Sequence, residues 1–339
     1  MSSSETRLSV ESLSAAWEGD PVLEAVSFSV TAGELAVLLG PNGSGKTTLL
    51  RCLAGLEPLT AGHVRLDGQD LAQIPPHRRG IALMFQDPAL FPHRTVFENI
   101  AYAPLLRRRP RAEIDTDVDR LVALLGLKGL EDRLPASLSG GERQKVALAR
   151  TLAARPKVIL LDEPFASIDV EVKAELRAEF RRVLRSLDTT AVHVTHDREE
   201  GFFLGDRVGL LFDGRLEAWG TPSEVYERPS GPRAARFLGY NVLSSPRGDV
   251  AVAPADLTID PSPSAAPRYT VVASGSVGRE SVVVLRGASG ERAELRALEP
   301  FARPPIGAQV ALRWERFRPL GPEPTPSQIA KRPPGVGPA

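Results

Sequence analysis

The chain has 339 residues, of which 42% are apolar and 25% are charged, and its 42 basic and 42 acidic residues balance to a net charge of zero. This composition is typical of a globular protein with a sizeable core, and the length exceeds that of one typical domain. A net charge of zero gives no indication of a nucleic-acid or membrane-surface partner.

Two further features of the sequence concern the compartment. The single cysteine, Cys52, excludes an intrachain disulfide and is expected to pack in the core. The chain has no apolar run long enough to span a bilayer, and its first residues lack the apolar segment of a signal peptide. We therefore expect a cytoplasmic protein.

The first predicted elements are two strands and a helix with a glycine-rich loop before it. Residues 22–31 alternate between apolar and polar, and after the turn at Ala32-Gly33 residues 35–39 form a buried run. The loop that follows satisfies the pattern GxxxxGK[ST], with the sequence Gly40-Pro41-Asn42-Gly43-Ser44-Gly45-Lys46-Thr47. Its backbone N–H groups are expected to surround phosphates, with Lys46 on the outer phosphates and Thr47 on Mg²⁺.

The middle of the chain alternates between helical and strand-like patterns. A helical pattern begins at about Thr95 and indicates an inserted helical subdomain over about residues 87–155. Apolar runs at 158–161 and 191–194 flank an amphipathic stretch at 172–187, which predicts a parallel sheet with helices on its faces. The basic residues from Arg107 to Arg111 are most simply a solvated lead-in to a helix, with lipid headgroups as the alternative partner.

Beyond residue 240 the composition changes. Fifteen of the 30 prolines fall in residues 241–339, among short strand-like runs, which predicts a small β domain over 241–320. Residues 321–339 are rich in proline and have little to bury, so we expect a disordered tail. The sequence thus predicts one large domain over 5–240 followed by a small one.

A buried strand predicted at 158–161 ends in two acids, Asp162 and Glu163. Acids at this place can bind Mg²⁺ and activate a water molecule, although they can also cap the next helix. Farther along, His196 follows the apolar run 191–194, where an imidazole can hydrogen-bond a phosphate and orient water. His193 lies within that run, and spacing alone leaves open which histidine has this role.

A second predicted phosphate-binding element is the run Leu138-Ser139-Gly140-Gly141-Glu142-Arg143-Gln144-Lys145. A serine hydroxyl and exposed backbone N–H groups at the start of a helix can bind an anion. The alternative is a simple helix cap with a flexible lead-in. The sequence therefore contains two phosphate-binding elements for one nucleotide.

In this order along the chain, the glycine-rich loop, Gln86, the run at 138–145, the acids at 162–163 and His196 resemble the motifs of the ABC ATPase family. The resemblance implies an α/β P-loop NTPase cassette with a mixed sheet, a β-subdomain and a helical insert, followed by a small OB-like β domain. It implies ATP and Mg²⁺ as ligands, Asp162 and Gln86 on Mg²⁺, Glu163 as general base and His196 as switch histidine. It also implies ATP contacts for Trp17, Thr48, Ser139, Gly140, Gly141 and Asp169.

Residues 91–100, 194–200 and 220–226 are similar to the ATP-binding subunits of bacterial solute importers of the iron, polyamine, thiamine and sulfate branch. That resemblance implies a homodimer with composite ATP sites and separate transmembrane permeases. It also implies a position on the inner face of the membrane and an indirect link to a solute-binding protein. We expect a small ion such as ferric iron, or a polyamine, as the solute. No nucleic-acid partner is expected.

The alternatives are an ABC exporter cassette and a DNA-repair or translation-associated ABC ATPase. Repair proteins insert long coiled coils or zinc-binding cysteines, whereas 93 residues (139 minus 46) separate Lys46 from Ser139 here. The chain departs from the importer pattern at Phe165-Ala166-Ser167-Ile168-Asp169, at Glu142, where glutamine is commoner, and at Ala253-Pro254-Ala255. These departures concern inter-subunit contacts, the second phosphate-binding element and the C-terminal domain.

Overall fold

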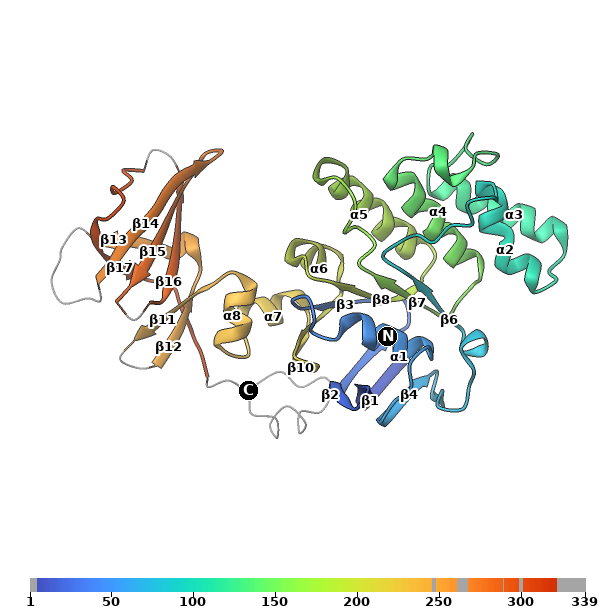
Figure 1. The fold of residues 1–339 in the computed structure, drawn as a ribbon, viewed down its shortest axis with the longest axis horizontal. Helices are drawn as coiled ribbons and strands as arrows, with labels where there is room; N and C mark the ends of the chain where they lie inside the picture. The colour runs from blue at the N-terminus through green and yellow to red at the C-terminus, as the bar shows by residue number, and fades with distance from the viewer. Residues whose placement is uncertain (1–4, 246–247, 261–267, 289, 299–300, 322–339) are drawn as a thin grey trace. The chain divides into compact units, whose positions relative to one another are not determined.

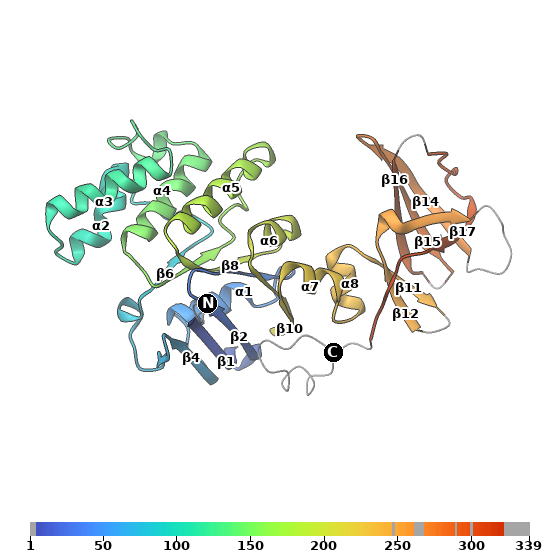
Figure 2. The same ribbon diagram turned by 180° about the vertical axis from the view of Figure 1, so that it is seen from behind.

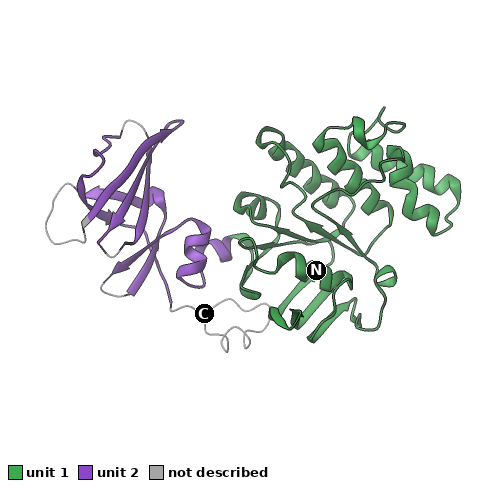
Figure 3. Cartoon of the chain, in the orientation of Figure 1, with its two compact units in different colours: residues 1–222, 329–339 green, residues 223–328 purple. Residues whose placement is uncertain are grey.

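The computed structural model describes residues 5–245, 248–260, 268–288, 290–298 and 301–321. Within them the chain forms two compact units, which divide between Pro222 and Ser223 (Figure 3). None of the helices in these ranges is long and apolar enough to cross a membrane.

The first unit begins with an antiparallel sheet in the order β2-β1-β4-β5. Its strands are β1 (Thr6–Trp17), β2 (Asp20–Thr31), β4 (Ala61–Leu66) and β5 (Gln69–Asp70). Strand β2 was predicted from the alternation at 22–31, whereas β1 was missed. Trp17, expected ahead of the first strand pair, is instead the last residue of β1 and lies opposite Asp20 in the hairpin.

The second sheet of this unit has six strands in the order β10-β9-β3-β8-β7-β6. They are β3 (Leu35–Leu39), β6 (Ile81–Met84), β7 (Val158–Asp162), β8 (Thr190–Thr195), β9 (Arg207–Phe212) and β10 (Arg215–Gly220). All neighbours are parallel except β9 and β10, so the sheet is mixed, as predicted. Strands β3, β7 and β8 are buried along their whole length because both faces of the sheet are covered.

Helices cover both faces of the six-stranded sheet (Figures 1 and 2). Helix α1 (Lys46–Ala54) lies between the two sheets, where Leu49, Leu50 and Leu53 join a core that both sheets share. On the opposite face lie α4 (Gly140–Ala153) and α5 (Val170–Ser186). The remaining helices of this unit are α2 (Val96–Leu106), α3 (Arg111–Leu124), α6 (Arg198–Leu204) and the 3-10 turns η1 (Pro76–Arg78) and η2 (Pro135–Ser137).

Helices α2, α3 and α4 lie within residues 87–155, and α2 packs on both other helices; that these residues form a separate subdomain stays a prediction. The basic residues from Arg107 to Arg111 lie at the junction of α2 and α3. There Arg109 is 2.7 Å from Asp117, and Arg111 is 2.9 Å from Asp115. These neighbouring acids neutralise two of the arginines. The pairing favours a solvated helix junction over a lipid-binding cluster.

The second unit combines two short helices with two antiparallel sheets, ordered β11-β12-β18 and β13-β17-β14-β15-β16. The elements are α7 (Pro222–Glu227), α8 (Pro232–Leu238), β11 (Asn241–Ser245), β12 (Gly248–Val252), η3 (Pro254–Asp256), β13 (Leu257–Asp260), β14 (Arg268–Val277), β15 (Glu280–Gly287), β16 (Arg292–Leu298), β17 (Gln309–Trp314) and β18 (Arg318–Pro319). Both sheets contribute to one apolar core, which includes Leu243, Leu257, Val283 and Leu312.

The division at Pro222 groups α7 and α8 with the β domain. The ring of Tyr226 of α7 packs at 5.1 Å against that of Tyr240 in a tilted arrangement, and the Arg318 guanidinium lies over both rings. The boundary at residue 240 stays a prediction. The tail predicted at 321–339 lies outside the described residues except for Gly321.

Candidate active site

The glycine-rich loop joins β3 to α1 in a conformation that depends on its glycines. Gly43 and Gly45 have φ angles of +81° and +96°, in the left-handed region that side chains disfavour. A Cβ at Gly40 would collide with Leu211 O and with Ser44 Oγ. The Ser44 hydroxyl is buried and has no hydrogen-bond partner among the described residues. A loop with this shape and an unpaired buried donor fits a phosphate group.

Lys46 is the first residue of α1, and its side chain is only 5% exposed. Its Nζ donates to Gly40 O at 3.0 Å and to Pro41 O at 2.9 Å, and lies 3.7 Å from Glu163 Oε1. Burial lowers the pKa of Lys46, while the neighbouring carboxylates of Glu163 and Asp162 oppose that change. The ammonium group is therefore held at the loop by carbonyls that phosphate oxygens can replace.

Thr47 and Asp162 bring two oxygens together next to the loop. Thr47 Oγ1 donates to Asp162 Oδ1 at 3.0 Å, and Asp162 is the last residue of β7. Burial raises the pKa of Asp162, with the neighbouring Glu163 charge adding to that effect. A hydroxyl and a carboxylate are ligands that Mg²⁺ prefers, and a cation would favour the ionised carboxylate. The two residues thus fit the predicted magnesium site.

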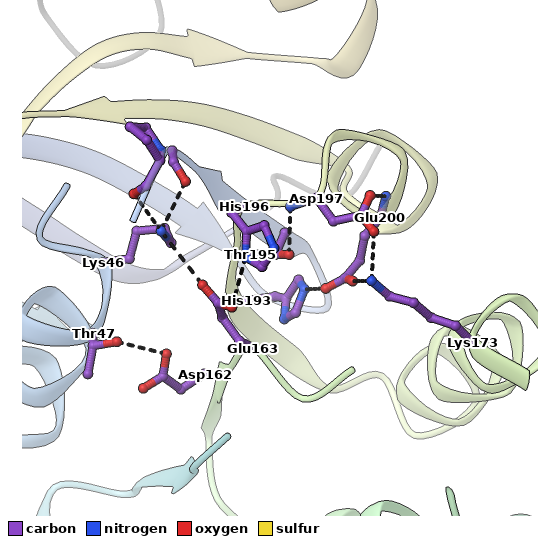
Figure 4. A network of polar contacts seen from close by, with 12 residues as sticks. Lys46, Thr47, Asp162, Glu163, Lys173, His193, Thr195, His196, Asp197 and Glu200 are labelled. Atoms are coloured by element: carbon purple, nitrogen blue, oxygen red, sulfur yellow. Dashed lines mark hydrogen bonds and ion pairs between the residues drawn. The ribbon is translucent and has the colours of Figure 1, made fainter. Parts of the chain in front are cut away.

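Glu163 lies between a lysine and a histidine at the end of β7 (Figure 4). Its Oε2 is 2.9 Å from His196 Nδ1, in addition to the Lys46 contact. Its φ angle is +43°, an uncommon value that costs about 1–3 kcal/mol in a residue other than glycine. The N–H of Glu163 donates to Val194 O at 3.1 Å, which connects it to β8. The carboxylate is therefore aimed at the lysine and the histidine.

The structure distinguishes the two histidines of β8 and the loop after it. His193 has no exposed surface, and its Nε2 lies 2.5 Å from Glu200 Oε1 of α6. His196 has a half-exposed side chain that contacts Glu163. Of the two histidines, His196 is therefore the one that lies beside Glu163.

Ser139 begins α4 as its N-cap in a reciprocal capping box. Its Oγ accepts from the N–H of Glu142 at 3.2 Å, and Glu142 Oε2 accepts from the N–H of Ser139 at 2.7 Å. Glu142, which stands where glutamine is commoner in the family, thus helps to cap the helix. Gly140 lies beside Ile168, because a Cβ on this glycine would be 3.6 Å from the isoleucine Cδ1.

Comparisons with known proteins agree with this geometry. A sulfate/thiosulfate import ATP-binding protein of Mycobacterium tuberculosis H37Rv is 44% identical over 264 residues, which are 78% of this chain and 74% of that protein. This chain belongs to the ATP-binding proteins of ABC transporters. The family profile described as ABC transporter matches residues 23–166 of this ABC ATPase. The predicted P-loop cassette fold and ATPase class are confirmed.

Further relatives of this ABC ATPase are import proteins. An Fe(3+) ions import ATP-binding protein of Streptomyces coelicolor is 40% identical over 91% of this chain and 94% of its own length. A spermidine/putrescine import ATP-binding protein of Acidothermus cellulolyticus is 46% identical over 67% of this chain and 60% of its own length. The solved structure of cbiO1 from Clostridium perfringens, part of the ABC transporter complex cbiONQ, has 29% identity and a TM-score of 0.62. The similarity covers 66% of this chain and 91% of the chain in that structure.

Five predicted site residues of the ABC ATPase gather in one cluster, while others lie apart from it. The cluster contains Lys46, Thr47, Asp162, Glu163 and His196. No hydrogen bond or ion pair within the described ranges joins it to Trp17, Gln86, Ser139, Gly140, Gly141 or Asp169.

The residues outside the cluster lie at ends of elements of the first unit. Trp17 is 55% exposed at the end of β1, and Asp169 is exposed at the N-cap of α5. Gln86 is exposed after β6, where its carbonyl accepts from Gln144 Nε2 at 3.2 Å. The contact that Gln144 makes was not predicted, because no sequence pattern links a residue on α4 to one 58 positions earlier.

Proposed function

We propose that this chain is the ATP-hydrolysing subunit of a solute importer and acts as a homodimer with separate permease subunits. The observation that carries the proposal is the Glu163 carboxylate, which lies 3.7 Å from Lys46 Nζ and 2.9 Å from His196 Nδ1 beside the phosphate loop. A carboxylate at this place can accept the proton of a water molecule that attacks a bound nucleotide.

Each residue of the cluster has a defined part in the proposed hydrolysis. The loop N–H groups and the Ser44 hydroxyl would bind the phosphates, and Lys46 would exchange its two carbonyl contacts for phosphate oxygens. A water oxygen then bonds to the γ-phosphorus while the bond to the β-phosphate oxygen breaks. Glu163 takes the water proton, and ADP and phosphate result. His196 holds the carboxylate and would release it by turning toward the γ-phosphate.

Magnesium would be held by Thr47 and Asp162, with Gln86 reaching it from the end of β6. When bound, the ion neutralises charge that develops on the phosphate oxygens. The chain's own contribution is the short Thr47–Asp162 contact, which already places a hydroxyl and a carboxylate oxygen 3.0 Å apart.

The second phosphate-binding element would act in the partner copy. Ser139, Gly140 and Gly141 begin an exposed helix terminus away from Lys46, so a single copy contains both elements without joining them. A head-to-tail pair with two-fold symmetry places each terminus against the other copy's ATP. Asp169 would line the same composite site, and Trp17, Gly43 and Thr48 would contact the nucleotide of their own copy.

Permease contact and location follow from the same proposal. The subunit would lie at the cytoplasmic face of the membrane and transmit closure of the dimer through the segment that joins Gln86 to α2. Phe91 lies in that segment, and the centre of its ring is 4.5 Å from that of Tyr102 of α2, with the rings tilted by 48°. A photo-crosslinker at position 91 should capture a permease subunit, whereas one at exposed Glu199 should not.

For the solute, we propose ferric iron, with a polyamine as the next candidate. The support is coverage: the Fe(3+) import relative aligns with 91% of this chain, and the spermidine/putrescine relative with 67%. Cells without the gene for this chain should take up less radioactive iron but normal amounts of sulfate and spermidine. Wild-type protein should restore uptake, and Glu163→Gln should not. If iron uptake is normal and the uptake of another solute is lost, iron is refuted as the solute and the other compound is the one transported.

A further inference from the structure

A second charged network lies beside the cluster that contains Glu163 and His196, and its residues come from α5, β8 and the start of α6 (Figure 4). Lys173 Nζ of α5 is 2.7 Å from Asp197 Oδ2 and 3.4 Å from Glu200 Oε2. Glu200 also lies 2.5 Å from His193. Three of these side chains are at least four-fifths buried: His193, Glu200 and Lys173 are 0%, 2% and 16% exposed. The family motifs assign no role to Lys173.

Each carboxylate oxygen of the network has its own partner. Asp197 Oδ1 accepts from the Glu200 N–H at 3.1 Å and thereby caps α6, while Oδ2 binds Lys173. Glu200 Oε1 binds His193, and Oε2 faces Lys173. Because Lys173 is the cation between the two carboxylates, its removal would leave two neighbouring negative charges at the start of α6.

The place of these contacts in the chain connects them to catalysis. Asp197 directly follows His196, and Lys173 lies in the first turn of α5, four residues after Asp169. Glu163 begins the loop that leads from β7 into α5, and His196 begins the loop that leads from β8 into α6. On the sheet side, the Glu163 N–H connects the first loop to β8 by donating a hydrogen bond to Val194 O at 3.1 Å. On the helix side, Lys173 joins α5 to the start of α6 through its contacts with Asp197 and Glu200.

We propose that Lys173 is a positioning residue that holds the loop of His196 against Glu163. The inference rests on the proposed function, because it assumes that the Glu163–His196 pair acts in hydrolysis. Lys173 touches neither residue and acts by fixing the start of α6 relative to α5. A misplacement of about 1 Å in such a pair slows chemistry by about a hundredfold while substrate binding persists.

The test compares Lys173→Met with wild type in the full chain. Glu179→Gln is the matched control, because Glu179 is also on α5, is also 16% exposed and pairs with Lys145 of α4, away from His196. We expect Lys173→Met to lower kcat by about tenfold or more with KM and the affinity for a fluorescent ATP analogue within about twofold. The control should keep its kcat. Lys173→Arg should recover most of the rate.

A second comparison separates positioning from general loss of structure. In a His196→Ala background, where slow hydrolysis is followed with radiolabelled ATP, Lys173→Met should cause no further decrease in rate. An equal fractional decrease in both backgrounds would overturn the proposal, as would an unchanged kcat of Lys173→Met or a parallel loss in Glu179→Gln. If Lys173→Met does not fold, Asp197→Asn keeps the helix cap, weakens the Lys173 contact and should give the same pattern.

Failure of this inference and failure of the proposed function give different results. If Glu163→Gln is inactive and Lys173→Met is fully active, only the role of Lys173 is refuted. If Glu163→Gln hydrolyses ATP at the wild-type rate, the catalytic role of the pair itself is refuted. The histidine NMR spectrum adds a readout independent of turnover, because only five histidines are present. The ring signals of His196 should move in Lys173→Met and stay in place in Glu179→Gln.

Discussion

Glu163→Gln removes the proposed general base while keeping the size of the side chain. The carboxylate lies 3.7 Å from Lys46 Nζ, which corresponds to an attraction of about 4 kcal/mol at an effective dielectric constant of about 20, before desolvation is counted. Glutamine releases Lys46 from this attraction, so MgATP should bind as tightly as to wild type or more tightly. Hydrolysis should slow by about 10²–10⁴-fold, equivalent to about 3–5 kcal/mol of activation free energy.

The assay measures binding and turnover separately on the same preparations. A fluorescent ATP analogue gives the affinity, and release of inorganic phosphate gives kcat and KM. Glu199→Gln is the control, because it removes the same charge from an exposed position on α6. Hydrolysis by Glu163→Gln at the wild-type rate would refute the general-base assignment. Weaker nucleotide binding would refute the competition between Glu163 and phosphate for Lys46.

Three further substitutions test separate parts of the site. Because burial raises the pKa of Asp162, its ionised form destabilises the fold increasingly as pH rises above the ordinary aspartate value of about 4. Asp162→Asn should therefore raise the unfolding midpoint more at neutral than at acidic pH and abolish stabilisation by Mg²⁺ with ATP; equal midpoints at both pH values would contradict this. Trp17→Phe should remove the tryptophan fluorescence change on ATP addition, and an unchanged signal would argue against a contact between Trp17 and the nucleotide. Glu142→Ala breaks the capping box and should lower the free energy of urea unfolding by about 0.5–1 kcal/mol; no change would show that the cap adds nothing.

Much of the first unit could be predicted because its strands are short apolar runs between recognisable loops. The runs at 35–39 and 158–161 became β3 and β7, and the glycine-rich loop lies between a strand and a helix as expected. Strand β1 was missed because its burial pattern is interrupted by bulges, and Ser12 within it has a φ angle of +48°. An irregular alternation of this kind does not stand out in a sequence.

The candidate site was predictable where a local motif carries the chemistry. Asp162 and Glu163 follow a buried run, and the structure places both beside Lys46. The choice between His193 and His196 depended on resemblance, since spacing alone does not distinguish the histidine within the apolar run from the one that follows it. Their different burial is set by α6, which supplies Glu200 to His193. Lys173 was missed because its partners lie more than twenty positions later in the chain.

The central claim is that the second phosphate-binding element acts on the ATP of the partner copy. Ser139→Arg leaves an intact phosphate loop, and Lys46→Ala leaves an intact Ser139 element, so each variant alone should be inactive. Mixed in equal amounts, half of the dimers are heterodimers with one complete composite site of two, so hydrolysis should recover to about a quarter of the wild-type rate. If Ser139 served its own copy, no dimer in the mixture would contain a complete site, and the mixture would stay inactive.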